Sequence, residues 1–307
     1  MKNKIFFVIN GKIKKIDKLE NEIKYFFFKD FDIEILRTKK KSDGILYAQK
    51  ATNNSADFLI AIGGDGTINE VVNGVMLANA QNRKNIAVGL LPTGTGNDFA
   101  RSIKMKKSIK YLHFLIKNNL SSKIDIGKIN FTNFDNSIET RFFINIADMG
   151  VGAETVRIVN GSSKFLGSTL TFLLTVLRVF ANYKHQNLRF FFNDEEHQNK
   201  IVTLCFAKGK YFGSGLGVAP HACTTDGFLS MTIVGELNIL HFLKYMPAIR
   251  KCKLIKNEKI SYQKTKFCKV ESNDSKKYPV EIDGEYIGTT PFKIEVVPNI
   301  INFLMEK

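Results

Sequence analysis

The chain has 307 residues, with 45 lysines and arginines against 29 aspartates and glutamates, which gives a formal net charge of +16. This length exceeds the usual size of one hydrophobic core, so we expect two domains. The positive charge favours an anionic partner, such as a polyphosphate, an anionic membrane or a nucleic acid. The four cysteines include no Cys-x-x-Cys pair, which argues against both a zinc site and a disulfide framework.

Two apolar segments resemble targeting or membrane segments, but both are too short. Residues 5–9 form an apolar run below the roughly 7 to 15 residues of a signal-peptide core. Residues 165–177 are uncharged but fall short of the roughly 18 to 20 residues that span a bilayer. We therefore expect a cytoplasmic protein.

The first 123 residues alternate between strand-like and helix-like patterns. The predicted strands cover residues 5–9, 33–36, 58–62 and 86–91. Of the four predicted helices, the first ends near residue 28, the second covers residues 42–51, the third begins at residue 67, and the fourth begins after residue 97. Such alternation predicts a mainly parallel sheet covered by helices. In sheets of this kind, ligands bind beyond the carboxyl ends of the strands.

The pattern changes near residue 124, where short β-branched and aromatic segments begin to dominate. The predicted strands cover residues 123–131, 141–146, 188–192, 201–207, 229–234, 280–282 and 293–297, with turns at residues 193–194, 226–227 and 298–299 and helices at about residues 163–180 and 238–255. We expect an antiparallel β-sandwich domain over residues 124–290. Residues 291–307 are expected to form C-terminal strands that pack back on the first domain.

Two glycine-rich segments each follow a predicted strand and lead into a predicted helix. They are Gly63-Gly64-Asp65-Gly66-Thr67 and the segment Pro-Thr-Gly-Thr-Gly-Asn-Asp-Phe-Ala-Arg over residues 92–101. Glycine lets the main chain approach an anion closely, and the N–H groups of a helix start attract phosphate. Carboxylates at Asp65 and Asp98 would repel that phosphate unless a cation or a hydrogen-bond network intervenes, and Mg²⁺ is the simplest such cation. The two segments therefore predict binding of a nucleoside triphosphate with its metal, and phosphoryl transfer.

The order of these segments resembles the diacylglycerol-kinase catalytic family. This family contains soluble bacterial diacylglycerol kinases, related bacterial lipid kinases, and sphingosine and ceramide kinases. The resemblance continues through residues 143–147, 209–215, 219–222 and 226–227 to the acidic segment at residues 281–285. It implies an α/β nucleotide-binding domain like those of phosphofructokinase and NAD kinase, followed by a lipid-substrate and metal domain.

The resemblance also implies which residues bind ATP, hold Mg²⁺ and take part in catalysis. Glu285 is the expected proton acceptor, Asp283 competes with it for that role, and Asp65 organises the site. The expected metal ligands are the side chain of Asp226 and the main-chain oxygens of Cys223 and Phe228. The expected ATP-binding residues are Asn10, Thr38, Gly63, Gly64, Asp65, Gly66, Thr67, Ile68, Asn69, Glu70, Gly94, Thr95, Asn97 and Asp98.

The chain departs from the family pattern in four places. Its first loop, at Asn10, is short and lacks the usual proline. Lys208 stands where an asparagine is usual, Ser214 interrupts a run of glycines, and Gly152 replaces a common aspartate.

We therefore expect an ATP- and Mg²⁺-dependent lipid kinase that converts diacylglycerol to phosphatidic acid at an anionic membrane. The alternatives within the enzymes are a sphingoid-base kinase, a phosphatidylglycerol kinase and an NAD kinase. A nucleotide sensor or a basic nucleic-acid-binding protein is the alternative of another class, but the absence of tryptophan and of a basic stretch interleaved with aromatics argues against nucleic acid. The apolar helix near residues 165–180 either packs on the sheet or helps to draw in an acyl chain. The oligomeric state, including a dimer, stays open.

Overall fold

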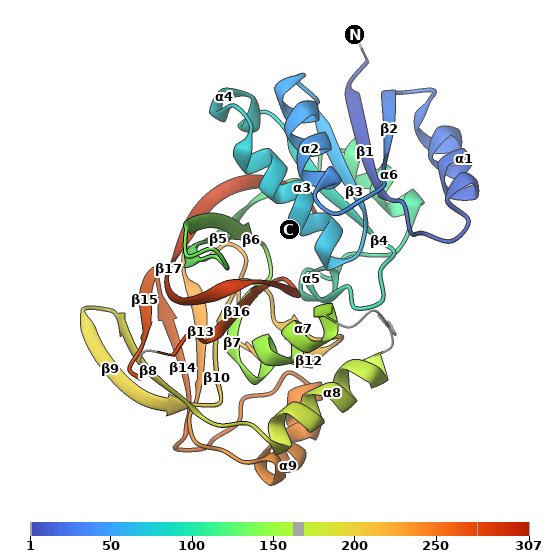
Figure 1. Ribbon diagram of the computed structural model, residues 1–307. Coiled ribbons are helices and arrows are strands. Elements are labelled where there is room, and N and C mark those ends of the chain that lie inside the picture. The colour runs from blue at the N-terminus through green and yellow to red at the C-terminus, as the bar shows by residue number, and fades with distance from the viewer. Residues whose placement is uncertain (1, 162–168, 275, 307) are drawn as a thin grey trace. The chain divides into compact units, whose positions relative to one another are not determined.

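The computed structural model describes residues 2–161, 169–274 and 276–306 (Figure 1). The chain folds into two units. Unit 1 comprises Met1–Ile124 together with Asn299–Lys307, and unit 2 comprises Asp125–Pro298.

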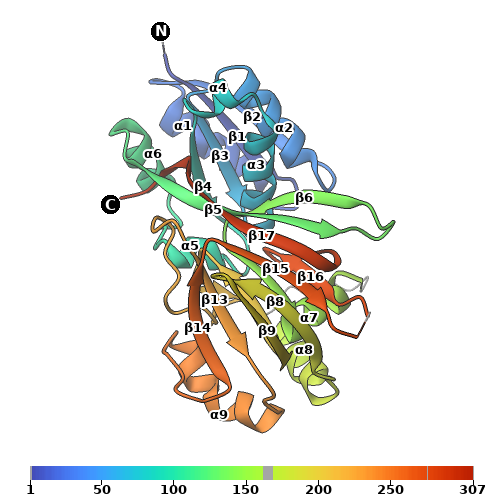
Figure 2. The same cartoon turned by 90° about the vertical axis from the view of Figure 1, so that its left-hand side faces the viewer.

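Unit 1 contains a parallel sheet with helices on both faces. Its strands lie in the order β4-β3-β1-β2, and the end of β17 pairs in parallel beside β4. Helices α1 and α6 contact each other on one face of the sheet, while α2 and α3 contact each other on the opposite face (Figures 1 and 2). The strands are β1 (Lys4–Asn10), β2 (Asp32–Thr38), β3 (Phe58–Gly63), β4 (Ala87–Pro92) and the end of β17 (Glu285–Leu304). The helices are α1 (Ile16–Phe27), α2 (Asp43–Asn53), α3 (Asp65–Leu77), α4 (Ala80–Arg83), α5 (Asp98–Ser102) and α6 (Ile109–Lys117).

The strand order of unit 1 places a ligand crevice at the carboxyl ends of its strands. Strand β1 lies between β2 and β3, so the order of the chain reverses on its two sides. Asn10 at the end of β1 pairs with Thr38 at the end of β2, and Gly63 at the end of β3 pairs with Pro92 at the end of β4. All four carboxyl ends therefore lie along one edge, and open α/β sheets bind their ligands at such a switch point. The predicted mainly parallel sheet is confirmed.

Unit 2 contains antiparallel strands in two sets that β17 joins. One set follows the order β14-β13-β10-β7-β16-β17, and in the other β9, β8 and β15 lead to a later part of β17. The strands are β5 (Ser121–Thr132), β6 (Ile138–Phe143), β7 (Ile146–Gly150), β8 (Gln186–Phe192), β9 (Glu195–Ile201), β10 (Thr203–Ala207), β11 (Tyr211–Phe212), β12 (Leu216–Gly217), β13 (Leu229–Val234), β14 (Ile260–Thr265), β15 (Phe267–Ser272), β16 (Pro279–Ile282) and β17. The helices are α7 (Val151–Gly161), α8 (Thr169–Ala181) and α9 (Ile239–Arg250).

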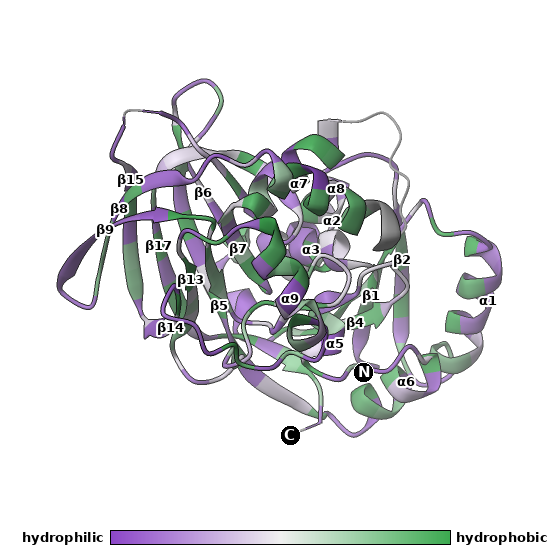
Figure 3. Cartoon of the chain, turned by 90° about the horizontal axis from the view of Figure 1, so that it is seen from below, coloured by the Kyte–Doolittle hydropathy of each residue, from purple (hydrophilic) through white to green (hydrophobic). Residues whose placement is uncertain are grey.

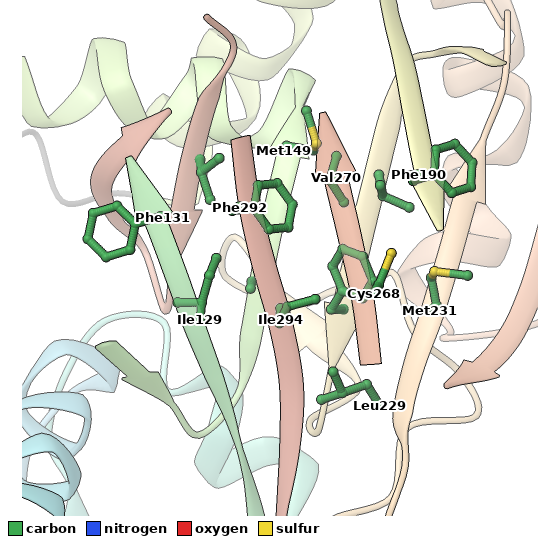
Figure 4. Close-up of a cluster of buried hydrophobic side chains, with 14 of the residues drawn as sticks. Ile129, Phe131, Met149, Phe190, Leu229, Met231, Cys268, Val270, Phe292 and Ile294 are labelled. Carbon is green, nitrogen blue, oxygen red and sulfur yellow. The ribbon is translucent and has the colours of Figure 1, made fainter. Parts of the chain in front are cut away.

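The core of unit 2 lies between these strand sets. Alternate residues of β8 are buried, as expected for a strand with one face on a core. Figure 4 shows the cluster, in which residues of β13 and β7 pack with residues of β15, β17, β8 and β5. Its labelled members are Ile129, Phe131, Met149, Phe190, Leu229, Met231, Cys268, Val270, Phe292 and Ile294. Burial of apolar side chains from two strand sets confirms the predicted β-sandwich.

The structure departs from the sequence-based expectations at several places, and strands β9, β14 and β15 were not predicted. The predicted turn at residues 298–299 does not end a strand, because β17 pairs with β15 before it and with β4 after it, and Asn299 takes a positive φ of 51° within the strand. Residues 291–298 belong to unit 2, past the expected boundary at residue 290. Helix α7 was not predicted. The predicted helix at residues 163–180 is α8 from Thr169 onward, and its residues 163–168 lie outside the described part of the chain.

Candidate active site

The two glycine segments of unit 1 lie against each other at the crevice. A Cβ atom placed on Gly94 would lie 2.5 Å from the Cα atom of Gly64, which is closer than real Cβ contacts. A Cβ atom on Gly63 would lie 2.1 Å from Oγ1 of Thr67. Glycine is therefore required here by close approach of the two loops, and this approach brings the ends of β3 and β4 into one site.

The Asp65 carboxylate connects the two segments. It accepts hydrogen bonds from the N–H groups of Asp98, at 3.1 Å, and Phe99, at 3.0 Å, which lie in the first turn of α5. These are two of the N–H groups that a helix start leaves without a helical partner. Asp65 thus holds the second loop on the first.

The start of α3 offers main-chain donors to an anion. Gly64 is the N-cap residue of this helix of 13 residues and has no side chain with which to cap it. The Thr67 N–H donates to the main-chain oxygen of Gly64 at 3.0 Å, so the N–H groups of Asp65 and Gly66 remain for another acceptor, with the positive end of the helix dipole behind them. Nearby, Thr93 Oγ1 and Asn97 Oδ1 are buried and have no hydrogen-bond partner among the described residues. Polar atoms of this kind fit a bound ligand.

Asn10 and Thr38 lie at the same edge, at the ends of β1 and β2. Nδ2 of Asn10 donates to Oγ1 of Thr67 at 3.3 Å, which links the end of β1 to the start of α3. Oγ1 of Thr38 accepts from the N–H of Gly11 at 3.2 Å. The short first loop therefore stays against this edge without a proline. Thr95 is exposed there.

Three other residues that were expected to contact ATP are engaged inside unit 1. The Ile68 side chain is fully buried, and Asn69 accepts hydrogen bonds from the amide of Asn73. The Glu70 carboxylate accepts from the N–H groups of Ser42 and Gly44 at 2.8 and 2.9 Å, and so holds the start of α2.

In unit 2, Asp283 and Gly284 form the tight turn between β16 and β17. Their φ angles are 49° and 86°, and Ile282 pairs with Glu285 across a two-residue loop, which is the pattern of a type I′ hairpin. The carboxylate of Asp283 is buried and accepts three main-chain N–H groups at 2.8 to 3.0 Å, from Ile144, Asn145 and Ile146. It thus holds the junction of β6 and β7.

Glu285, one residue past the turn, is placed differently. Its side chain is 24 % exposed, and Oε2 lies 3.3 Å from Nη2 of Arg141. Of the two candidate proton acceptors, Glu285 is the one whose side chain reaches solvent and so can meet a substrate hydroxyl.

The residues expected to hold Mg²⁺ contact lysines instead. Lys208 Nζ donates to Asp226 Oδ1 at 3.0 Å and to the main-chain oxygen of Phe228 at 2.7 Å. Lys264 Nζ donates to Asp226 Oδ2 at 2.8 Å. Burial by itself would raise the pKa of Asp226. The hydrogen bonds from Lys264 and Lys208 outweigh burial, so the pKa of this carboxyl group is lowered from its usual value. The Cys223 thiol lies 3.6 Å from Oγ1 of Thr225. In the described part of the chain, no group of three or more His, Cys, Asp or Glu side chains could hold a metal ion.

Sequence reasoning missed Asp125 and Lys264, which belong to this cluster. Asp125 lies between Ile124 and Ile126 in β5 and is completely buried. A single carboxylate within an apolar strand was the available signal, because buried charges are almost always paired.

Unit 2 also encloses an apolar cavity of about 140 Å³. Six of its lining side chains come from α8 and α9, namely Phe172, Val176, Phe180, Phe242, Tyr245 and Ile249. An apolar cavity of about this size, ~150 Å³, stays dry and binds apolar molecules such as benzene in an engineered protein. This cavity therefore suits part of a hydrocarbon chain, and the tertiary contact of α8 with α9 creates it.

Asp148 reaches this cavity from the opposite side and faces Glu281 across paired strands. Both carboxyl groups are buried. Burial raises the pKa of each well above its usual value, and the charge of Asp148 raises that of Glu281 further. A Cβ atom on Gly152 would lie 1.9 Å from Oδ2 of Asp148, so the aspartate that is common in the family would not fit at this position.

A parallel α/β unit with a glycine-lined edge, followed by an antiparallel β-sandwich, is the architecture of NAD-kinase-like enzymes. Residues 4–129 match the model of the diacylglycerol kinase catalytic domain, and residues 145–305 match that of the YegS C-terminal NAD kinase beta sandwich-like domain. The chain therefore belongs to the diacylglycerol kinase family and is a lipid kinase, as predicted. Membership of a kinase family implies the use of ATP.

Individual relatives agree with this assignment. The chain is 27 % identical over 261 residues to the diacylglycerol kinase of Staphylococcus carnosus (strain TM300). The aligned region covers 85 % of this chain and 80 % of the relative. It is 28 % identical to the diacylglycerol kinase of Staphylococcus aureus (strain JH9), and the aligned region covers 85 % of this chain and 78 % of that relative. The crystal structure of a diacylglycerol kinase from Bacillus anthracis str. Sterne shares the fold, with a TM-score of 0.71, 20 % identity and coverage of 99 % and 97 %. None of the helices that the structure describes has the length and apolar character needed to cross a bilayer.

Proposed function

We propose that this lipid kinase transfers the γ-phosphate of ATP to the free hydroxyl group of diacylglycerol, which yields phosphatidic acid and ADP. The observation that carries the proposal is the apolar cavity in unit 2, lined by residues of α8, α9 and several strands, which suits an acyl chain. The names of the staphylococcal relatives support the same acceptor.

The lining of the cavity favours an uncharged acceptor over a sphingoid base. Asp148 is the one ionisable carboxyl group among the described lining residues, and burial raises its pKa well above the usual value. Because burial disfavours the charged form of Asp148, this acid is a poor ion-pair partner for a cationic amine, and burying an unpaired amine is costly. Diacylglycerol carries no charge that needs a partner.

In the proposed reaction, unit 1 holds the phosphates of ATP and Glu285 accepts the proton of the lipid hydroxyl. The first-turn N–H groups of α3 bind phosphate oxygens. The lipid oxygen forms a bond to the γ-phosphorus, the bond from this phosphorus to the bridging oxygen breaks, and ADP leaves. The hydroxyl proton moves to the Glu285 carboxylate. Magnesium enters with the phosphates of the nucleotide, since Mg²⁺ in kinases is commonly bound by substrate phosphates and few carboxylates.

The α8–α9 face is our candidate for contact with an anionic membrane. Leu174 in α8 is 57 % exposed, and Leu240 and Leu243 in α9 are 70 % and 48 % exposed. None of the twelve residues of α9 is buried, and Figure 3 shows hydrophobic residues along both helices. Exposed apolar side chains beside a lipid-sized cavity fit insertion into a bilayer surface. Lysines near the same helix, such as Lys244 and Lys251, add attraction to anionic headgroups of about 1 kcal/mol each.

The acceptor can be identified with purified protein, labelled ATP and Mg²⁺, and micelles that contain diacylglycerol, sphingosine or phosphatidylglycerol. We expect label in phosphatidic acid. Label in one of the other lipids instead would replace diacylglycerol as the acceptor. Binding of ATP without label in any lipid would contradict the kinase proposal and favour a nucleotide sensor.

The membrane contact can be tested with the double variant Leu240→Glu and Leu243→Glu. We expect it to lose sedimentation with anionic vesicles while it still phosphorylates a short-chain diacylglycerol dispersed in solution. Leu46→Glu is the matched control, since Leu46 is 59 % exposed on α2 of unit 1. Equal loss of vesicle binding in both proteins would exclude the α8–α9 face as the specific contact.

A further inference from the structure

The Lys208 ammonium group is buried in a cage of oxygen atoms. Its side chain has an exposed fraction of 0 %. Nζ donates to Asp125 Oδ2 at 2.8 Å, to Asp226 Oδ1 at 3.0 Å and to the main-chain oxygen of Phe228 at 2.7 Å. An ammonium group has three N–H donors, so each of them has an acceptor here.

This cage joins four segments of unit 2 that are distant in the sequence. Asp125 comes from β5, Lys208 follows β10, Asp226 and Phe228 precede β13, and Lys264 comes from β14. Two further bonds close it, because Asp125 Oδ2 also accepts from the N–H of Gly227 at 2.8 Å and the Asp125 N–H donates to the oxygen of Thr224 at 2.7 Å. Lys208 is thus the central cation of a structural site.

The charges of the cluster balance without a metal ion. Two carboxylates, Asp125 and Asp226, face two ammonium groups, Lys208 and Lys264. A divalent cation on Asp226 and Phe228 would need their oxygens at about 2.1 Å. It would then stand beside the Lys208 ammonium, which already uses these oxygens, and the two positive charges would repel each other at low dielectric. The residues present therefore do not fit the metal that the family resemblance implies at Cys223, Asp226 and Phe228.

We propose that the Lys208 ammonium replaces a divalent metal at this site, as a permanent cation supplied by the chain itself. The lysine stands where the family usually has an asparagine, a residue that would leave room and negative charge for a metal ion. Unit 2 then folds without a structural metal, and the need for Mg²⁺ belongs to the nucleotide alone. The inference concerns the stability of unit 2 and holds whichever lipid accepts the phosphate.

The first test measures the wild-type protein and Asp226→Asn without nucleotide, in a chelator and in millimolar Mg²⁺ or Mn²⁺. For each protein, we take the rise in melting temperature that the metal ion causes. The difference between the rise in the wild-type protein and the rise in Asp226→Asn is the part that depends on Asp226. We expect this part to be zero, and we expect the wild-type protein after gel filtration to carry far less than one metal ion per chain. A rise of several degrees in the wild-type protein that Asp226→Asn abolishes would overturn the proposal.

The second test restores the residue that is usual in the family. Lys208→Asn leaves Asp125 and Asp226 with one ammonium group, and breaking a buried ion pair should lower the melting temperature in chelator by about 10 °C. Millimolar Mg²⁺ or Mn²⁺ should recover part of this loss and bind at one ion per chain. Lys264→Asn is the matched control, because it removes the other ammonium group that contacts Asp226. The Lys264 side chain is 51 % exposed, so its removal should create no metal response.

Two outcomes of the second test would count against the inference. A Lys208→Asn protein as stable as the wild type would show that the ammonium has no structural role. A destabilised Lys208→Asn protein without any response to metal would make Lys208 a structural residue but not a substitute for a metal ion. If Lys208→Asn does not fold in either buffer, the wild-type measurement alone decides.

Discussion

The two units use the carboxylates of their sites in different ways. In unit 1, Asp65 and Glu70 accept hydrogen bonds from main-chain N–H groups and hold the starts of neighbouring helices. In unit 2, Asp125 and Asp226 bind lysine ammonium groups, and Asp148 faces Glu281 in the core. Unit 1 thus uses its carboxylates to shape loops, whereas unit 2 uses them to join distant strands or places them in its core.

This difference agrees with the ligand that we propose for each unit. A phosphate-binding edge needs free N–H groups, so its carboxylates must be neutralised by other N–H groups and kept from the ligand. A cavity for a hydrocarbon chain needs an apolar lining, so the charges around it must be paired or neutral. Asp283 of unit 2 is the exception, since it accepts three main-chain N–H groups just as Asp65 accepts two.

The largest effect is expected from Glu285→Gln. Removal of a general base should lower the rate of phosphoryl transfer by about 10² to 10⁴-fold, while ATP affinity stays close to that of the wild type. Asp283→Asn is the matched variant two residues away. It removes part of a hydrogen-bonded carboxylate, so it should lower the free energy of unfolding by about 2 kcal/mol. Kinase assays, nucleotide titrations and urea unfolding distinguish the two effects. A fully active Glu285→Gln protein would move the proton acceptor to another residue.

The glycine edge can be broken by a single methyl group. Gly94→Ala should force the two loops apart and lower the free energy of unfolding by about 1 to 3 kcal/mol, because its Cβ atom would meet the main chain of Gly64. At Gly66, a Cβ atom would have no neighbour within 4 Å, and alanine favours a helix by about 0.5 to 1 kcal/mol.

Gly66→Ala should therefore be as stable as the wild type or more stable, yet bind ATP more weakly, since the methyl group lies among the first-turn N–H groups. Unfolding curves and ATP titrations of both variants test this contrast. Unchanged ATP affinity in Gly66→Ala would place the phosphates elsewhere.

A smaller, pH-dependent effect is expected from Glu281→Gln. Because the pKa of Glu281 is raised above its unfolded value near 4.5, its contribution to stability is complete below that value and is lost as the pH rises through the folded pKa. Between these two pKa values, the wild-type protein loses about 1.4 kcal/mol per pH unit from each such group.

Glutamine keeps an oxygen for the N–H of Gly284, which donates to Glu281 at 2.8 Å, but it does not titrate. The stability of Glu281→Gln relative to the wild type should therefore increase with pH, as measured by thermal melts between pH 5 and 9. A constant difference across this range would show that folding does not raise the pKa of Glu281, because the folded and unfolded states would then carry the same charge at this residue. Glu295→Gln, on an exposed carboxylate of β17, is the control and should show little pH dependence.

The local chemistry of the sequence predicted unit 1 well. Apolar runs ended at Ile9, Ile62 and Leu91, and the glycines after them indicated tight turns. The turn at Asp283-Gly284 was equally visible, since both residues readily adopt a positive φ. These features depend on neighbours a few residues apart. Helix α7 escaped prediction because it begins directly after β7, where Gly150 with a φ of 106° turns the chain.

What the sequence by itself determined is the alternation of strands and helices in unit 1, the strand-rich character of unit 2, the glycine edge, and the family to which the chain belongs. Only the tertiary structure decided that Lys208 meets Asp125 across 83 positions of the chain, that Asp148 faces Glu281, and that α8 and α9 enclose a cavity. The physical reason is that backbone preferences act between near neighbours, whereas the pairing of buried charges and the packing of apolar faces depend on which distant segments come together.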